Sequence, residues 1–319
     1  MRLKLVPKNT SWNFFSRSKL WIGISVILVV LSLISFFVQS LNFGIDFRGG
    51  TSIRTESSEP INVAAYRSAL SSLDLGDITI SEVFDPSFEA DQNVAMIRIQ
   101  AQPGQEAATS ILVENSLQNL KGVSEDIKFV SVESVGPKVS GELIKTAIIA
   151  VILAISAVLF YIWIRFEWQF AVGAISALIH DVILTIGIFS LLQIKFDLAI
   201  IAAILTIVGY SLNDTVVVFD RVRENLRKFK KRSLIEVMNL SINETMSRTV
   251  MTSVTTLLAL VSLFVLGGDV IRGFVFAMIW GVVVGTYSSI FIASAILLST
   301  GVKRDWSKSN AEAGTQVPQ

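Results

Sequence analysis

The chain has 319 residues, of which 52% are apolar, and its 27 basic and 26 acidic residues leave a formal net charge of +1. Since it has no cysteine and one histidine, it can form no disulfide, thiolate metal site, cysteine nucleophile or multi-histidine metal cluster. Several runs of about 20 almost uncharged residues predict a membrane protein and not a pair of soluble domains.

The chain begins with a basic segment, residues 1–19, which has no acidic residue and precedes an apolar run at 20–38. That run is too long for the core of a signal peptide, and no small-residue cleavage site follows it. We therefore expect a membrane anchor that stays in the protein.

Residues 39–142 form the one extended polar region and have the size of a small domain. Its apolar patterns predict, in order, a strand, a helix, two strands, a helix and a strand, at 51–55, 61–73, 78–84, 94–100, 106–120 and 127–132. This β-α-β-β-α-β order is the ferredoxin-like pattern. An acidic excess argues against nucleic-acid binding. The residues are Asp74, Asp77, Glu82, Asp85, Glu89 and Asp91.

Apolar runs resume after residue 142 and predict five more spans, at 143–164, 169–193, 198–219, 247–266 and 271–299. The turns between them are short, except for a basic loop at 220–247. Basic residues near span ends favour the cytoplasm, which places 1–19, 220–247 and the tail 300–319 inside and the 39–142 domain outside. The predicted fold is an α-helical polytopic membrane protein with six transmembrane helices, one plus five, and a ferredoxin-like external domain after the first.

The fourth span carries Asn213 and Asp214 inside an otherwise apolar helix. An ionised carboxylate at the bilayer centre costs about 2.5–3.5 kcal/mol on insertion scales, so such residues usually face a bundle interior. The pair could tie helices together by hydrogen bonds. Alternatively, Asp214 could exchange a proton, because burial disfavours its ionised form while a nearby cation such as Arg248 favours it. Arg248 could also be an arginine that extends to the lipid headgroups.

Other polar residues accompany this pair. Ser211 and Thr215 share a helix face with Asp214, so a hydroxyl could lie beside the carboxylate or bond its own backbone. In the third span, His180 and Asp181 are about 100° apart around a helix, so we expect them not to point at one partner. Packing support and a place in a proton pathway both remain open for Asp181.

The sixth span has a small residue at every fourth position. Small residues in one row let two helix backbones approach closely, which predicts a packing seam and not a cofactor site. The row consists of Gly273, Ala277, Gly281, Gly285, Ser289 and Ala293.

A glycine-rich motif, Phe-Gly-Ile-Asp-Phe-Arg-Gly-Gly-Thr at 43–51, follows the first span. It could be a turn into the external domain. We expect no helix there and no phosphate loop, because no Gly-Lys-Ser/Thr follows. Its candidate functional residues are Gly44, Asp46, Arg48, Gly49 and Gly50, with Asp46 and Arg48 expected to pair with each other or with a neighbouring domain.

Together, this motif, residues 135–142, His180–Asp181, the stretch 208–225, residues 247–249 and Gly267–Gly268 resemble the SecF branch of the SecD/SecF family, within the resistance-nodulation-division superfamily. The resemblance implies a bacterial inner-membrane subunit without cofactors that pairs with SecD beside the SecY-E-G channel. In that family the proton gradient helps to draw preproteins outward, and Asp214 and Arg248 match the proton-relay positions. Two alternatives are half of a small-molecule efflux pump and a structural subunit that stabilises SecD without proton transfer.

Overall fold

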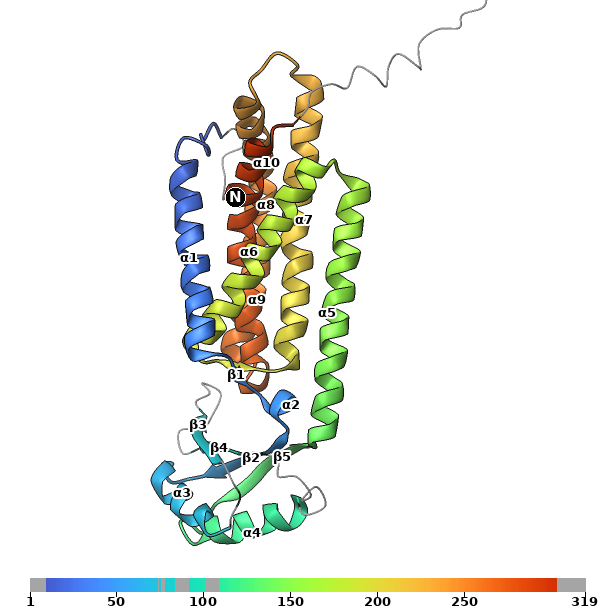
Figure 1. The fold of residues 1–319 in the computed structure, drawn as a ribbon. Coiled ribbons are helices and arrows are strands. Elements are labelled where there is room, and N and C mark those ends of the chain that lie inside the picture. The colour runs from blue at the N-terminus through green and yellow to red at the C-terminus, as the bar shows by residue number, and fades with distance from the viewer. Residues whose placement is uncertain (1–9, 74, 76–77, 84–91, 101–108, 303–319) are drawn as a thin grey trace, which may run out of the picture.

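The structure is a computed structural model that describes residues 10–73, 75, 78–83, 92–100 and 109–302. Within these residues, six helices are long and apolar enough to cross a membrane, and they stand on a small sheet domain (Figure 1). The predicted fold class is thereby confirmed. Outside the described residues lie 1–9 and the tail beyond residue 302. Most of the predicted acidic group also lies outside them, namely Asp74, Asp77, Asp85, Glu89 and Asp91.

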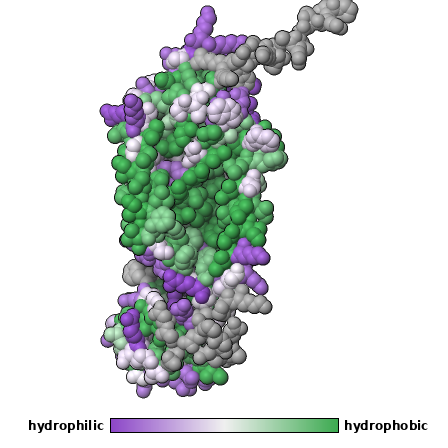
Figure 2. Space-filling view, in the orientation of Figure 1, coloured by the Kyte–Doolittle hydropathy of each residue, from purple (hydrophilic) through white to green (hydrophobic). Residues whose placement is uncertain are grey.

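The membrane bundle consists of long helices, each overlapping one predicted span. The end of the bundle beside the sheet domain is called the domain end here, and the opposite end the far end. An apolar band covers the bundle between more polar ends (Figure 2). The helices are α1 (Ser18–Gln39), α5 (Pro137–Arg165), α6 (Trp168–Leu192), α7 (Leu198–Lys228), α8 (Leu234–Leu266) and α9 (Asp269–Ser288), which continues through the π-helical turn η2 (Ser289–Ala293) into α10 (Ser294–Thr300).

The predicted loop at 220–247 is wrong, because helix α7 runs on to Lys228 and helix α8 already begins at Leu234. A capping box starts α8: the Ser233 side chain accepts from the Glu236 N–H, and the Glu236 carboxylate accepts from the Ser233 N–H. Charged residues end an apolar run, but Arg, Lys, Glu and Leu are good helix formers. The two helices therefore continue beyond the apolar band.

The sheet domain has four strands in the order β3-β4-β2-β5, and every neighbouring pair is antiparallel. This is the strand order of the split β-α-β pattern expected from the sequence. Two helices cover the face of the sheet that lies away from the bundle (Figure 1). The elements are β2 (Gly50–Ser57), α3 (Val63–Ser71), β3 (Ile78–Val83), β4 (Asn93–Gln100), α4 (Thr109–Lys121) and β5 (Lys128–Val135).

Residues 42–50, called the motif segment here, connect the bundle to the central strand β2. Strand β1 (Asn42–Phe43) pairs in parallel with β6 (Lys195–Phe196), which lies directly before α7. A single helical turn, α2 (Ile45–Arg48), follows, so the expectation of no helix here is wrong. Gly49 and Gly50 have φ angles of 70° and 123°, which side chains disfavour, and they redirect the chain from this turn into β2.

Candidate functional site

A buried carboxylate, Asp181 on α6, is the centre of a polar network in the bundle and is 1% exposed. Its Oδ2 accepts from the Ser211 hydroxyl of α7 at 2.6 Å and from the Ser288 hydroxyl of α9 at 2.8 Å. Its Oδ1 lies 2.9 Å from Nδ1 of His180. Both oxygens of Asp181 therefore have partners, and the carboxylate joins three helices.

We expected these two adjacent side chains not to point at one partner, and in the structure His180 contacts Asp181 itself. The His180 ring centroid lies 6.1 Å from that of Tyr287, whose hydroxyl lies 2.8 Å from Oγ of Ser25 on α1. A ring contact and a hydrogen bond thus connect His180 through Tyr287 to the first helix.

Asp214 on α7 is almost as buried, at 4% exposed, but its surroundings are different. Among the described residues, its Oδ2 has no hydrogen-bond partner. An unpaired polar group in such a place costs about 1–3 kcal/mol, and more when it is charged. Asp214 is therefore the carboxylate in this site whose ionised form is least supported by hydrogen bonds.

The positive charge of Arg248 on α8 acts on the carboxyl group of Asp214 on α7. None of the ion pairs found between described residues joins the two side chains. Arg248 is exposed and lines a cavity of about 360 Å³ with Arg221, Glu224 and Glu244, among others. The arrangement is a buried acid with a cation nearby but not in contact.

The other polar residues predicted beside Asp214 lie elsewhere. Asn213 is exposed on the outside of α7. Ser211 donates to Asp181, so its single hydrogen is not available to Asp214. Oγ1 of Thr215 lies 2.8 Å from Oγ of Ser289. The hydroxyls on α7 therefore serve the Asp181 network and the contact with α9.

The row of small residues on α9 faces α7. A Cβ atom built at Gly281 would lie 2.3 Å from Cγ1 of Ile207, and one at Gly285 would lie 3.0 Å from Cβ of Ser211. Ala277 and Ala293 are fully buried, while a Cβ at Gly273 would make an ordinary 3.4 Å contact with Ile200. Close approach of α9 to α7 brings Ser288 within reach of Asp181.

Two features of this site were missed in the sequence. Ser288 immediately precedes the predicted Ser289, and a serine pair in an apolar span is a signal that could have revealed it. The π-helical turn at 289–293 has no such signal. There Ser294 Oγ donates to the Ser289 carbonyl at 3.1 Å, and α6 packs so closely that a Cβ at Gly173 would lie 2.8 Å from the Ala293 carbonyl oxygen. Such turns often occur at functional sites.

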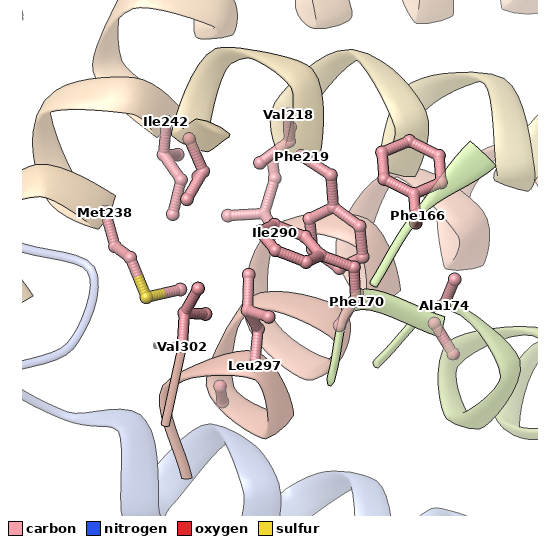
Figure 3. Close-up of a cluster of buried hydrophobic side chains, with 14 of the residues drawn as sticks. Phe166, Phe170, Ala174, Val218, Phe219, Met238, Ile242, Ile290, Leu297 and Val302 are labelled. Carbon is pink, nitrogen blue, oxygen red and sulfur yellow. The ribbon is translucent and has the colours of Figure 1, made fainter. Parts of the chain in front are cut away.

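An apolar cluster fills the bundle from the site to the far end (Figure 3). Phe219, five residues beyond Asp214, packs at ring-centroid distances of 5.3 Å from Phe170 and 6.2 Å from Phe166. Met238 and other side chains of α8 and α10 belong to the same cluster. The polar site is thus enclosed by closely packed apolar side chains on this side. Within the described part of the chain, no group of three or more potential ligands could hold a metal ion.

The motif segment contacts the start of α7, the helix that carries Asp214. Asp46 Oδ2 accepts from the Leu198 N–H at 3.1 Å, and the Gly44 N–H donates to the Phe196 carbonyl at 2.8 Å. Among the described residues Asp46 and Arg48 form no ion pair, and Arg48 is exposed. A Cβ at Gly44 would lie 3.0 Å from Cε of Lys195, so this contact requires a small residue.

Comparison with known proteins assigns the family. Residues 115–303 match the family described as "Protein export membrane protein SecD/SecF, C-terminal", and residues 34–61 match "SecD/SecF GG Motif". A relative from Cereibacter sphaeroides, named "Protein translocase subunit SecF", is 59% identical over 99% of this chain and 97% of its own length. This chain belongs to the SecF family. A SecF relative from Rhodobacter capsulatus is 57% identical over 96% of this chain and 94% of its own length.

The SecF assignment is supported by solved structures. The chain matches a crystal structure of SecDF, a translocon-associated membrane protein from Thermus thermophilus, with a TM-score of 0.81 and 33% identity over 94% of this chain. A second SecDF structure, in a super-membrane-facing form, matches with a TM-score of 0.68 and 34% identity over 98% of this chain. The chain spans only 40% and 41% of those SecDF chains. It is a multi-pass membrane protein of the SecF family of translocase subunits.

Proposed function

We propose that this chain acts with a SecD partner to couple inward proton flow across the bacterial inner membrane to preprotein export through the SecY-E-G channel. In this proposal both termini and the far end of the bundle lie in the cytoplasm, and the sheet domain lies in the periplasm. The basic residues near the far ends of α5 and α7, such as Arg165, Arg227 and Lys228, support that orientation.

The observation that carries the proposal is the unpartnered oxygen of Asp214. This carboxylate is buried and no described residue donates to its Oδ2, so its ionised form depends on the nearby Arg248. Two opposing influences of this kind allow a group to change its protonation state. When Asp214 takes up a proton, its attraction to Arg248 ends, and the preferred packing of α7 against α8 changes.

A route from Asp214 to the sheet domain supports coupling. Helix α7 begins where Asp46 and β1 of the motif segment are attached, and the motif segment continues into β2, the central strand of the sheet domain. The motif segment also contacts α5, because the Ser140 hydroxyl donates to the Ile45 carbonyl at 3.3 Å. A displacement of α7 at its domain end therefore pulls on the motif segment, and only a few residues separate that segment from the sheet domain.

The free energy of one proton limits what this mechanism can do. Moving one charge through ~100 mV supplies about 2.3 kcal/mol. Shifting a two-state equilibrium almost completely, from about 1:99 to about 99:1, requires about 5.5 kcal/mol. One proton therefore biases the motion, and a complete switch requires a pH difference or several protons in each cycle.

The alternative of a purely structural subunit is favoured by one observation, the complete set of partners around Asp181. Such a network holds helices together without any titrating step. The two functions differ at Asp214: proton coupling requires this residue to take up and release a proton, and the structural role does not.

The test is Asp214→Asn in full-length protein assembled with SecD. Preprotein export is measured in sealed membrane vesicles with and without an uncoupler. We expect the dependence of export on the proton gradient to be lost, while Glu167→Gln, the same change at an exposed residue in the turn after α5, leaves it intact. Full gradient dependence in an assembled Asp214→Asn protein would leave the structural role as the function.

A further inference from the structure

A basic pocket lies at the far end of the bundle, between the end of α5 and the last turns of α7. Its volume is about 560 Å³. Four cations and two carboxylates line it, so positive charge is in excess. The lining residues are Arg165, Asp220, Arg223, Glu224, Arg227 and Lys228.

The two carboxylates of the pocket are already paired with arginines. Asp220 accepts from Arg165 at 2.9 and 2.8 Å through its two oxygens, and Arg223 Nη1 lies 3.6 Å from its Oδ1. Glu224 is paired with Arg221, which does not line the pocket. Asp220 therefore offsets part of the charge of Arg165 and Arg223, and the four cations less the two carboxylates leave the lining with two excess positive charges.

An aromatic ring holds two of the cations in place. The guanidinium groups of Arg165 and Arg223 lie 5.1 Å and 5.5 Å from the ring centroid of Phe166, within the range of a cation–π interaction. Arg223 Nη1 also donates to the Arg165 carbonyl at 3.4 Å. Two planar donor groups are thus fixed near each other, and guanidinium is the side-chain group best suited to bind phosphate oxygens.

The side chains next to the pocket are those of a membrane surface. Trp163 on α5 is 70% exposed, Trp168 at the start of α6 is 62% exposed, and Ile164 between them is 67% exposed. Tryptophan is enriched where the bilayer meets water. Apolar side chains of α5 continue from here into the apolar band of the bundle (Figure 2).

We propose that this pocket binds the phosphate of an anionic phospholipid, with the acyl chains lying along the exposed apolar face of α5. Basic pockets between transmembrane helices on the cytoplasmic side are suited to such headgroups. Excess positive charge matches an anionic lipid and not a zwitterionic one, and the exposed tryptophans match a lipid and not a free phosphate ion. The site is independent of Asp214, and its test requires no export activity.

The experiment compares two double variants of the full chain in lipid nanodiscs. Arg227→Gln with Lys228→Gln removes two pocket cations, whereas Lys230→Gln with Lys231→Gln removes the same charge from neighbouring residues outside the pocket lining. Retention of phosphatidylglycerol over phosphatidylcholine is measured by native mass spectrometry. We expect at least about a tenfold loss for the pocket variant, because a direct charge-assisted hydrogen bond to a phosphate contributes more than diffuse attraction to the membrane surface.

The matched variant is expected to keep nearly all of its preference for phosphatidylglycerol. Equal losses in both variants would show diffuse attraction to basic residues, and an unchanged pocket variant would show that no site exists there; either result overturns the proposal. Displacement of the lipid by inorganic phosphate at millimolar concentration would also overturn it. If the glutamine variant is unstable, Arg227→Lys with Lys228→Arg keeps the charge and should keep lipid binding.

Discussion

Asp181 and Asp214 lie on neighbouring helices and are almost equally buried, but both oxygens of Asp181 have hydrogen-bond partners, whereas Oδ2 of Asp214 has none among the described residues. Hydrogen bonds connect the carboxyl group of Asp181 to side chains of three helices. Asp214 has only the attraction of Arg248, which is exposed and not in contact. Burial alone therefore does not distinguish the two acids, and the proposed proton exchange at Asp214 rests on the different donors around them.

The largest effect is expected for removal of the acid that has all the partners. Asp181→Ala removes the partner of the Ser211 hydroxyl and of Nδ1 of His180, whereas the Ser288 hydroxyl keeps the Gly285 carbonyl at 3.1 Å. Each unsatisfied buried group costs about 1–3 kcal/mol, so we expect the free energy of unfolding to fall by at least about 2 kcal/mol. Denaturant unfolding in mixed micelles, followed by tryptophan fluorescence, measures it. A change below about 1 kcal/mol would remove the distinction between the two acids.

A smaller loss is expected when α9 is pushed away from α7, because the close approach of these helices brings Ser288 to Asp181. In Gly281→Ala the new Cβ meets Ile207 at 2.3 Å, and overpacking of this kind costs about 1–3 kcal/mol. Gly209→Ala, whose Cβ has no atom within 4 Å, is the matched change on α7 and should stabilise by up to about 1 kcal/mol. Thermal unfolding measures both variants: the melting temperature should fall for Gly281→Ala and rise for Gly209→Ala.

A third acid, Asp126 in the sheet domain, extends the comparison to a carboxylate outside the membrane. Donation from Ser124 and Ser58 holds the pKa of Asp126 well below its ordinary value of 3.8. Because the folded-state pKa is depressed, its stabilisation is present above pH 4 and is lost as pH falls below about 4. Amide hydrogen exchange in β2 and β5, corrected for the pH dependence of the intrinsic exchange rate, should show protection falling below about pH 4 in the unmodified protein. In Asp126→Asn, protection should fall less over the same pH range.

The smallest change in stability is expected for Asp214→Asn. Since Oδ2 of Asp214 has no partner to lose among the described residues, the free energy of unfolding should stay within about 0.5 kcal/mol or rise slightly. The same denaturant unfolding as for Asp181→Ala measures it. A loss of several kcal/mol would indicate that Asp214 is a structural residue like Asp181.

Local sequence patterns predicted much of the fold. The apolar runs located six spans, because the length of a membrane helix is set by the bilayer and does not depend on its neighbours. The strand and helix order of the sheet domain followed from apolar periodicity in the same way. The ends of α7 and α8 were missed, because a helix ends where its caps are and not where its apolar run stops.

By itself, the sequence determined that this chain crosses a membrane, carries a small α+β domain and has acids at 181 and 214 inside its spans. Only the tertiary structure decided which acid is held by donors, because Ser288 is 107 residues away from Asp181 along the chain. The contact of Asp46 with Leu198 at the start of α7 joins residues 152 positions apart, so the sequence did not predict it either. Hydrogen-bond partners across helices depend on how backbones pack, and no spacing within one helix encodes them.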